Sequence, residues 1–224
     1  MRTSTTLAVA ALSSIAFPTL YLLYVRRDLS RKIHHEAQRG KLSPSITDAV
    51  KSIPDEAIAE ECPMVYECAW KAVSTSLLPD IAREKLLVQY LQRNMTKFSA
   101  SPQAFAIKRM CSPQVLKTFE RTYIESLGFL EASLVCGVYQ VQLRGEDRIE
   151  LSMETHMPFS GRLVVTVEER DGRTVFGNHV VQWKQPGEKA SMPLEGTVAT
   201  WIHQFFVWWL LDSGTKHFIN LKKS

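Results

Sequence analysis

The side chains best suited to chemistry in this sequence are two histidines in apolar surroundings. His179 shares one face of a predicted strand with Val175, Val181 and Trp183, and His203 interrupts the aromatic run of the last predicted helix. A neutral imidazole inside an apolar pocket can exchange one proton or one hydrogen bond with a bound molecule. His179 and His203 are therefore the candidate catalytic residues. At both positions the alternative is a core histidine whose hydrogen bonds are satisfied within the protein.

Large aromatic side chains near these histidines could form the wall of an apolar pocket. The candidate substrate-binding residues are Trp183, Trp201, Phe205 and Trp208. Tryptophan and phenylalanine contribute a large apolar area, and an aromatic stripe of this kind can equally be ordinary core.

A second group of titratable residues lies on another predicted strand. Glu150, Ser152 and Glu154 share one strand face, and His156 follows them. Paired carboxylates could perform acid–base chemistry if that face were buried. A solvated outer face of an antiparallel hairpin is the favoured interpretation.

No metal site and no cofactor site are predicted. His34 and His35 have no carboxylate or cysteine at helical spacing, so they are expected to be solvated. The four cysteines form no CxxC pair and are expected to be reduced thiols. The chain also lacks a phosphate loop, a nucleophile elbow, a zinc-protease motif and a dinucleotide fingerprint, which disfavours cofactor-dependent enzymes.

The candidate residues must be positioned by elements that the periodicity of the chain predicts. Apolar residues recur every three to four positions over 79–97 and again over 113–127, which predicts two amphipathic helices. The period then changes to two, which predicts one hairpin from 139–143 and 149–153. A second hairpin is predicted from 163–169 and 175–183, closed by Asp171 and Gly172.

The last predicted element is an aromatic helix over 198–211 that ends at 212–214. A helix that is apolar on all sides must be buried or must contact lipid. We expect an α+β fold in which helices pack on a curved antiparallel sheet, with this long C-terminal helix closing one face. Such an arrangement leaves room for a cavity between sheet and helix.

The N-terminal part of the chain predicts a membrane anchor. Residues 3–25 carry no charged side chain, and Arg26, Arg27, Arg31 and Lys32 follow them. About 20 apolar residues span a bilayer core, and the basic cluster places the following domain in the cytosol. The prediction is a single-pass protein of the endoplasmic reticulum. Asn94 begins a glycosylation sequon that would be used only in the opposite, lumenal orientation.

The predicted domain organisation has three parts. These are a transmembrane anchor (1–25), a loosely packed juxtamembrane linker (26–60) and one α+β globular domain (61–224). The net charge of +4 owes much to the cluster after the anchor, which suits anionic lipid headgroups. Nucleic-acid binding is disfavoured because no basic surface motif with interleaved aromatic residues occurs.

Several short motifs resemble those of a group of small fungal proteins with one N-terminal membrane segment. The motifs are RRDLS (26–30), FSASPQA (98–104), VCGVY (135–139), LEG (194–196) and WWLLDSGT (208–215). Some members of the group occur in secondary-metabolite gene clusters, and norbornene-forming cyclases of sordarin-type diterpenoid biosynthesis are similar to it. The resemblance implies a terpenoid or polyketide pathway as the setting and transfers no catalytic residue.

Two functions fit these observations. The first is a membrane-anchored biosynthetic protein that binds a hydrophobic terpenoid or polyketide intermediate and promotes its cyclisation without a cofactor, as a pericyclase of Diels–Alder type would. The second is a non-enzymatic lipid- or metabolite-binding protein, or one that tethers partner enzymes of a pathway at the membrane. A polar group inside the cavity is required only by the first function.

Overall fold

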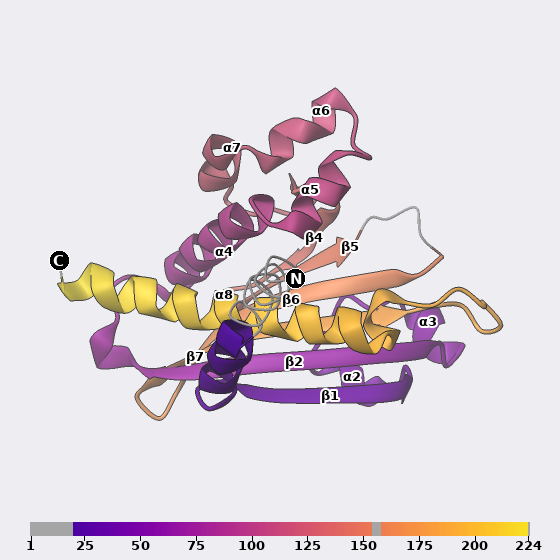
Figure 1. The fold of residues 1–224 in the computed structure, drawn as a ribbon, viewed down its shortest axis with the longest axis horizontal. Coiled ribbons are helices and arrows are strands. Elements are labelled where there is room, and N and C mark those ends of the chain that lie inside the picture. The colour runs from indigo at the N-terminus through magenta and orange to yellow at the C-terminus, as the bar shows by residue number, and fades with distance from the viewer. Residues whose placement is uncertain (1–19, 154–157, 224) are drawn as a thin grey trace, which may run out of the picture.

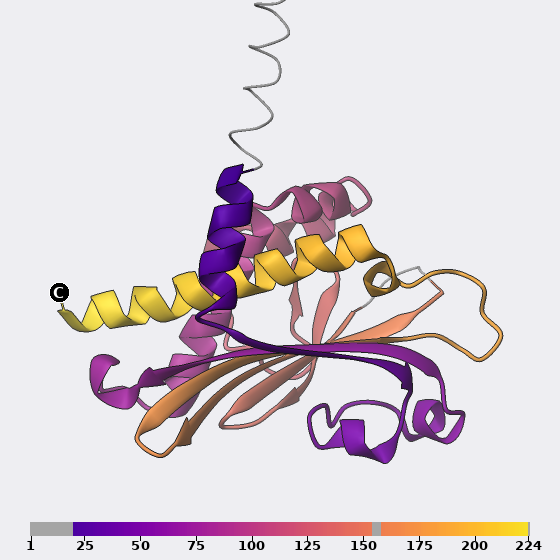
Figure 2. The same ribbon diagram turned by 60° about the horizontal axis from the view of Figure 1, so that its bottom comes forward.

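The computed structural model of the protein describes residues 20–153 and 158–223. Residues 20–30 are helical, and in Figure 2 this helix projects away from the rest of the domain. Most of the expected anchor, residues 1–19, lies outside the described residues. Within the described ranges, none of the helices has the length and apolar character that crossing a membrane requires.

The centre of the fold is an open, antiparallel seven-stranded sheet in the order β1-β2-β7-β6-β5-β4-β3 (Figure 1). This sheet, with its helices, confirms the expected α+β class. The strands are β1 (His34–Lys41), β2 (Pro63–Ser74), β3 (Leu134–Val135), β4 (Tyr139–Arg144), β5 (Arg148–Met153), β6 (Ser160–Arg170) and β7 (Arg173–Trp183). The four predicted strands correspond to β4 to β7, and the other three were not predicted.

The β6–β7 hairpin closes as its sequence predicts. Asp171 and Gly172 both have positive φ, 50° and 70°. A two-residue turn of this conformation matches the right-handed twist of the two strands it joins, and aspartate and glycine are the residues that adopt it most readily. The register of the hairpin therefore follows from local sequence.

Residues 34–60 differ from the loosely packed linker that the sequence predicts. Strand β1 pairs with β2 along its eight residues. Two short helices follow, α2 (Pro44–Thr47) and α3 (Asp55–Ala59), which bury Ile46 and Ala57. Most side chains of β1 are exposed, so the strand is held by its backbone ladder and has no apolar periodicity to reveal it.

The predicted helix over 113–127 is broken into shorter pieces. The structure has α6 (Pro113–Leu116), a 3₁₀ turn (Lys117–Phe119) and α7 (Arg121–Ser126), with Glu120 in an extended conformation between them. The break buries Phe119 against the sheet side of the domain. The preceding helices are α4 (Arg83–Ser99), close to its prediction, and α5 (Pro102–Lys108).

The C-terminal helix α8 (Thr197–Lys223) is longer than predicted and does not end at Gly214. A Cβ atom on Gly214 would lie 2.6 Å from Cε2 of Tyr90, so glycine here permits α8 to approach α4 closely. Asp212 accepts a hydrogen bond from Lys71 Nζ at 2.8 Å, which secures the helix to β2. Asp212 and Gly214 therefore serve packing and do not terminate the helix.

The two faces of the sheet are covered differently (Figure 2). Helices α8 and α4 cover one face and form the larger core with the sheet. Helices α2 and α3 cover part of the other face. This smaller core consists of Leu42, Ile46, Val50, Ile53, Ala57, Cys62, Met64, Val164, Val181 and Trp183.

Candidate functional site

A cavity of about 110 Å³ lies between α4, α8 and the sheet. One water molecule needs only about 10–15 Å³ on the same measure, so the space is large enough for a small organic group. Most of the lining is apolar. The lining residues are Leu91, Asn94, Met95, Phe98, Gln103, Tyr139, Met153, Leu163, Val165, Asn178, Val180, Gln182, His203, Phe206, Val207 and Leu210.

A few polar side chains interrupt this apolar lining. Asn94 of α4 and Asn178 and Gln182 of β7 are all buried, and His203 of α8 is half-buried. An apolar cavity with a small number of polar groups is the usual composition of a small-molecule site, because the apolar wall supplies affinity and the polar groups fix orientation. The strand β7 contributes its amides because alternate residues share one sheet face.

His203 is held by a buried carboxylate. Glu67 of β2 is only 5% exposed, and its Oε2 lies 3.1 Å from Nδ1 of His203. The other oxygen, Oε1, accepts a hydrogen bond from Gln204 Nε2 at 3.1 Å. A carboxylate accepts and does not donate, so Glu67 selects the tautomer of His203 with its proton on Nδ1. Nε2 of His203 is then the basic nitrogen.

Arg26 connects this group to the N-terminal helix. Its guanidinium donates to Oε1 of Gln204 at 2.9 Å and to the carbonyl of Trp201 at 3.2 Å. It also lies 4.9 Å above the ring of Trp201 and 4.7 Å above that of Trp208. Partial burial lowers the pKa of Arg26, and the charge of Glu67 opposes that change. The chain just after the predicted anchor is thus fixed to the helix that carries His203.

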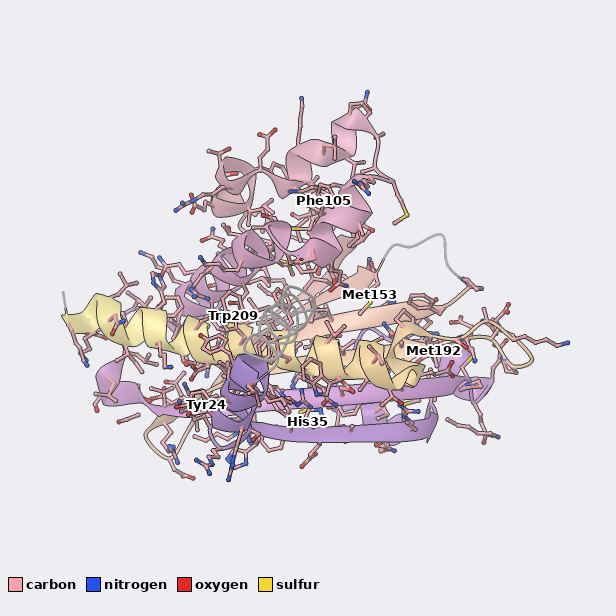
Figure 3. All side chains as sticks on the ribbon, in the orientation of Figure 1. Tyr24, His35, Phe105, Met153, Met192 and Trp209 are labelled. Atoms are coloured by element: carbon pink, nitrogen blue, oxygen red, sulfur yellow. The ribbon has the colours of Figure 1, made fainter. Side chains whose placement is uncertain are left out.

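A second, much smaller cavity of about 10 Å³ adjoins the first and is lined by His35, Glu67, His203 and Trp208, among others. His35 Nε2 and Trp208 Nε1 are buried there and have no hydrogen-bond partner among residues 20–153 and 158–223. Burial lowers the pKa of His35, which favours the neutral ring. His35, labelled between β1 and α8 in Figure 3, is therefore half-buried and not solvated as predicted, whereas His34 is exposed.

The structure does not bring His179 and His203 together, because they lie on opposite faces of the sheet. His179 belongs to the face covered by α2 and α3, where its Nδ1 lies 2.8 Å from the hydroxyl of Tyr66. Burial, followed by the charge of Arg148, lowers the pKa of His179 to about 4. Trp183 is buried on the same face, with the guanidinium of Arg162 5.2 Å from its ring.

The predicted aromatic wall is divided as well. Trp201 and Phe205 stack on each other on α8 with their ring centroids 6.0 Å apart, and Trp208 lines the smaller cavity. None of the three lines the larger cavity, where Phe98, Tyr139 and Phe206 supply the aromatic surface. The rotation of a buried helix about its own axis determines which of its residues face a cavity. The amino-acid composition of the helix does not reveal that rotation.

Sequence reasoning missed Glu67, Asn178 and Gln182. Glu67 could have been found, because it is the one acidic residue in the apolar run 63–70. A carboxylate in such a run must be paired or hydrogen-bonded if the strand is buried. Asn178 is next to His179 in β7 and therefore lies on the opposite strand face, which is the face that borders the cavity.

Glu150 and Ser152 are buried and not part of a solvated face as predicted. Glu150 accepts hydrogen bonds from the backbone N–H groups of Lys51 at 3.0 Å and Ser52 at 2.8 Å. The segment between α2 and α3 covers this strand face, which strand periodicity alone does not predict. Glu154 and His156 lie outside the described residues.

The remaining predicted sites concern metal, thiols and glycosylation. No cluster of three or more metal-ligating side chains occurs in residues 20–153 and 158–223. Cys62, Cys68, Cys111 and Cys136 are free cysteines. Asn94 is 5% exposed and lines the cavity, so a glycan on it would require the cavity wall to open.

Comparison with known proteins identifies one distant structural neighbour. No family model and no curated protein matches the chain. Among solved structures, CalU16 from Micromonospora echinospora is similar over 85% of this chain and 99% of its own, at 9% sequence identity and a TM-score of 0.34. A likeness at this level carries no argument about function.

Proposed function

We propose that this protein is a membrane-anchored biosynthetic protein that binds a hydrophobic terpenoid or polyketide intermediate in the cavity between α4, α8 and the sheet, and promotes its cyclisation. The observation that carries the proposal is the apolar cavity with His203 in its wall and a buried carboxylate behind that histidine. An apolar intermediate gains affinity by leaving water for this lining, at about 25 cal/mol per Å² of apolar surface.

Such a site can accelerate a cyclisation in two ways. The walls hold a flexible polyene in a folded, reactive conformer, which removes much of the entropic part of the barrier. Polar groups then stabilise charge that develops on the reacting atoms. In the tautomer selected by Glu67, Nε2 of His203 accepts a proton or hydrogen bond from an acidic C–H or an enol, and the protonated ring donates it back.

The buried amides have a separate role in this proposal. Asn178 and Gln182 lie four residues apart on one face of β7, both in the cavity wall and with Val180 between them. Their spacing of about 13 Å along the strand suits an elongated ligand with one oxygen substituent toward each end, such as a carbonyl and a hydroxyl. Discrimination between intermediates would rest on these two hydrogen bonds.

The cellular setting also belongs to the proposal. The uncharged segment 3–25 and the basic residues after it support an anchor in the endoplasmic reticulum with the domain in the cytosol. The resemblance to small fungal membrane proteins supports a secondary-metabolite pathway. Membrane lipid and other enzymes of that pathway are the proposed partners.

A matched pair of tryptophan substitutions on α8 tests ligand binding. Val207 lines the cavity, whereas Val198 is exposed and does not. With the full-length protein in detergent micelles and the fluorescent polyene cis-parinaric acid as probe, Val207→Trp should weaken binding at least about tenfold, because the indole fills the cavity. Val198→Trp should leave it unchanged. Equal binding by both variants, or no binding by the parent protein, would contradict the proposal.

A matched pair of histidine substitutions tests catalysis against simple binding. Metabolites are profiled in a host that makes the candidate intermediate and expresses His203→Phe or His179→Phe. The first should lower product about a hundredfold or more, since general acid–base groups contribute about 10²–10⁴-fold. The second should have little effect, because His179 lies on the other face of the sheet. If His203→Phe keeps full turnover while the polyene still binds, the protein is a carrier.

A further inference from the structure

Three large apolar side chains are exposed on α5 and on the first two turns of α8, the helix segments next to the cavity. Val198 and Ile202 of α8 are 74% and 56% exposed, and Phe105 of α5 is 58% exposed. None of them lines the cavity itself. We call Phe105, Val198 and Ile202 the apolar rim.

The cavity opens toward this rim. Gln103 of α5 is exposed and also lines the cavity, so it marks the mouth. His203 and Phe206, on the other side of the mouth, follow Ile202 on α8. The mouth therefore lies between α5 and the N-terminal half of α8.

The helix formed by residues 20–30 projects from the same side of the domain as the rim (Figure 2). Figure 2 shows it rising from the sheet on the side where α8 and the α5–α7 helices lie. Its direction is fixed, because Arg26 bonds to α8 and Leu29 is 2% exposed in the main core. Residues 20–25, which end the uncharged segment, therefore project from the face that carries the mouth.

Charge on this face complements an anionic bilayer. The guanidinium of Arg109, an exposed residue, lies 4.5 Å from the ring centroid of Phe105. Arg27 and Arg31, at the base of the helix, are exposed as well. Cations beside exposed aromatic rings suit the headgroup layer, where the ring enters the apolar boundary and the cation meets phosphate or carboxylate.

We propose that the apolar rim lies in the lipid surface and that the cavity takes its ligand directly from the bilayer. This inference rests on the proposed function and adds the route by which an apolar intermediate arrives. Such a molecule concentrates in the membrane, and transfer through the rim avoids exposing it to water.

Depth-dependent quenching tests the orientation. Ile202→Cys and Glu56→Cys, each in a Cys111→Ser background, are labelled with bimane in the full-length protein reconstituted in vesicles of phosphatidylcholine and phosphatidylserine. Nitroxide-labelled lipid should quench the probe at 202 about threefold more than at 56, since a rim residue enters the interface. Glu56 is exposed on α3, on the opposite face. Equal quenching would overturn the orientation.

Charge substitutions test the route itself. The double variant Phe105→Glu and Ile202→Glu should slow transfer of cis-parinaric acid from these vesicles into the protein about tenfold, because the carboxylates are repelled by the anionic surface. Leu77→Glu, at an exposed apolar residue of another element, is the matched control. Binding in detergent micelles should be unchanged in all variants. Unslowed transfer with intact micellar binding overturns this inference alone, whereas loss of micellar binding in the parent protein overturns the proposed function.

Discussion

Glu67 and Glu150 are two buried glutamates on strands of the same sheet, and their carboxylates accept hydrogen bonds from different kinds of group. Glu150 is fully buried on the face covered by α2 and α3 and accepts from two backbone N–H groups. Glu67, on the face covered by α8, accepts from the side chains of His203 and Gln204. Backbone amides have no other protonation state, but a histidine ring does.

The two faces differ in the same way. On the face of Glu150, His179 is bonded to Tyr66 and the apolar residues pack into the smaller core. On the face of Glu67, the packing leaves the space that His203 borders. A buried carboxylate is therefore a sign of a candidate catalytic site only under two conditions. Its hydrogen-bond partner must be able to gain or lose a proton, and that partner must line a cavity.

The matched substitutions Glu150→Gln and Glu67→Gln should separate the two roles most strongly. Glu150→Gln should cost about 3 kcal/mol of unfolding free energy. Its NH₂ replaces one of the two acceptor oxygens, so the N–H of either Lys51 or Ser52 loses its partner, and the ion pair with Arg148 is lost as well. Glu67→Gln should cost less than about 1 kcal/mol, because His203 can adopt the other tautomer and accept from the new NH₂. Urea denaturation measures both.

The same pair makes an opposite prediction for activity. In Glu67→Gln the proton of His203 moves to Nε2. The basic nitrogen is then Nδ1, which is occupied by the new amide, so product should fall about a hundredfold or more. Glu150→Gln should retain activity wherever it remains folded. Equal losses of stability in the two variants would show that the carboxylates have the same structural role.

Adjacent valines on β7 test how tightly each face is packed. Val181 is fully buried in the smaller core. Val181→Ala should lower the free energy of unfolding by about 2.5 kcal/mol, because a new cavity forms. Val180 borders existing cavities, so Val180→Ala should cost only about 1 kcal/mol. Thermal and urea unfolding of the two variants give the comparison, and similar values would contradict the difference in packing.

The pH dependence of stability tests the buried state of His179. Its pKa is about 4 in the folded protein, against about 6.5 for an unperturbed histidine. The unfolded chain therefore binds a proton between these values while the folded protein does not, so stability falls as pH falls from about 6.5 to 4 and is unaffected above 6.5. Allowing for solvent screening of this partly buried side chain, the loss should be about 2 kcal/mol. It should be absent in His179→Gln, measured by urea titration across this window.

The sequence predicted the elements whose periodicity is strong. The hairpins β4–β5 and β6–β7 and the helix α4 are close to their predicted ranges. Apolar and polar residues alternate with the period of the element in β4, β5 and α4, and an Asp-Gly turn marks the β6–β7 hairpin. Strand β1 was missed because its side chains are mostly exposed. The predicted end of α8 at 212–214 failed because Asp212 and Gly214 face Lys71 and Tyr90, which are distant in sequence.

The candidate site was predicted in part. His203 was identified as a polar residue in an aromatic helix, and it does line the cavity. His179 was paired with it because both lie in apolar surroundings, but alternation along a strand does not say which layer covers each face. Glu67 was overlooked because its partner is 136 positions away in the chain.

The sequence by itself determined local features. These are the alternation of apolar and polar residues, the turn that needs positive φ and the point where charge ends an apolar segment. Together these features were enough to predict an α+β fold. What the tertiary structure decided is which residues meet. The order of strands placed β2 beside β7, and the rotation of α8 aimed His203 at Glu67, because both depend on the summed packing of distant segments. The site exists only at that crossing of sheet and helix.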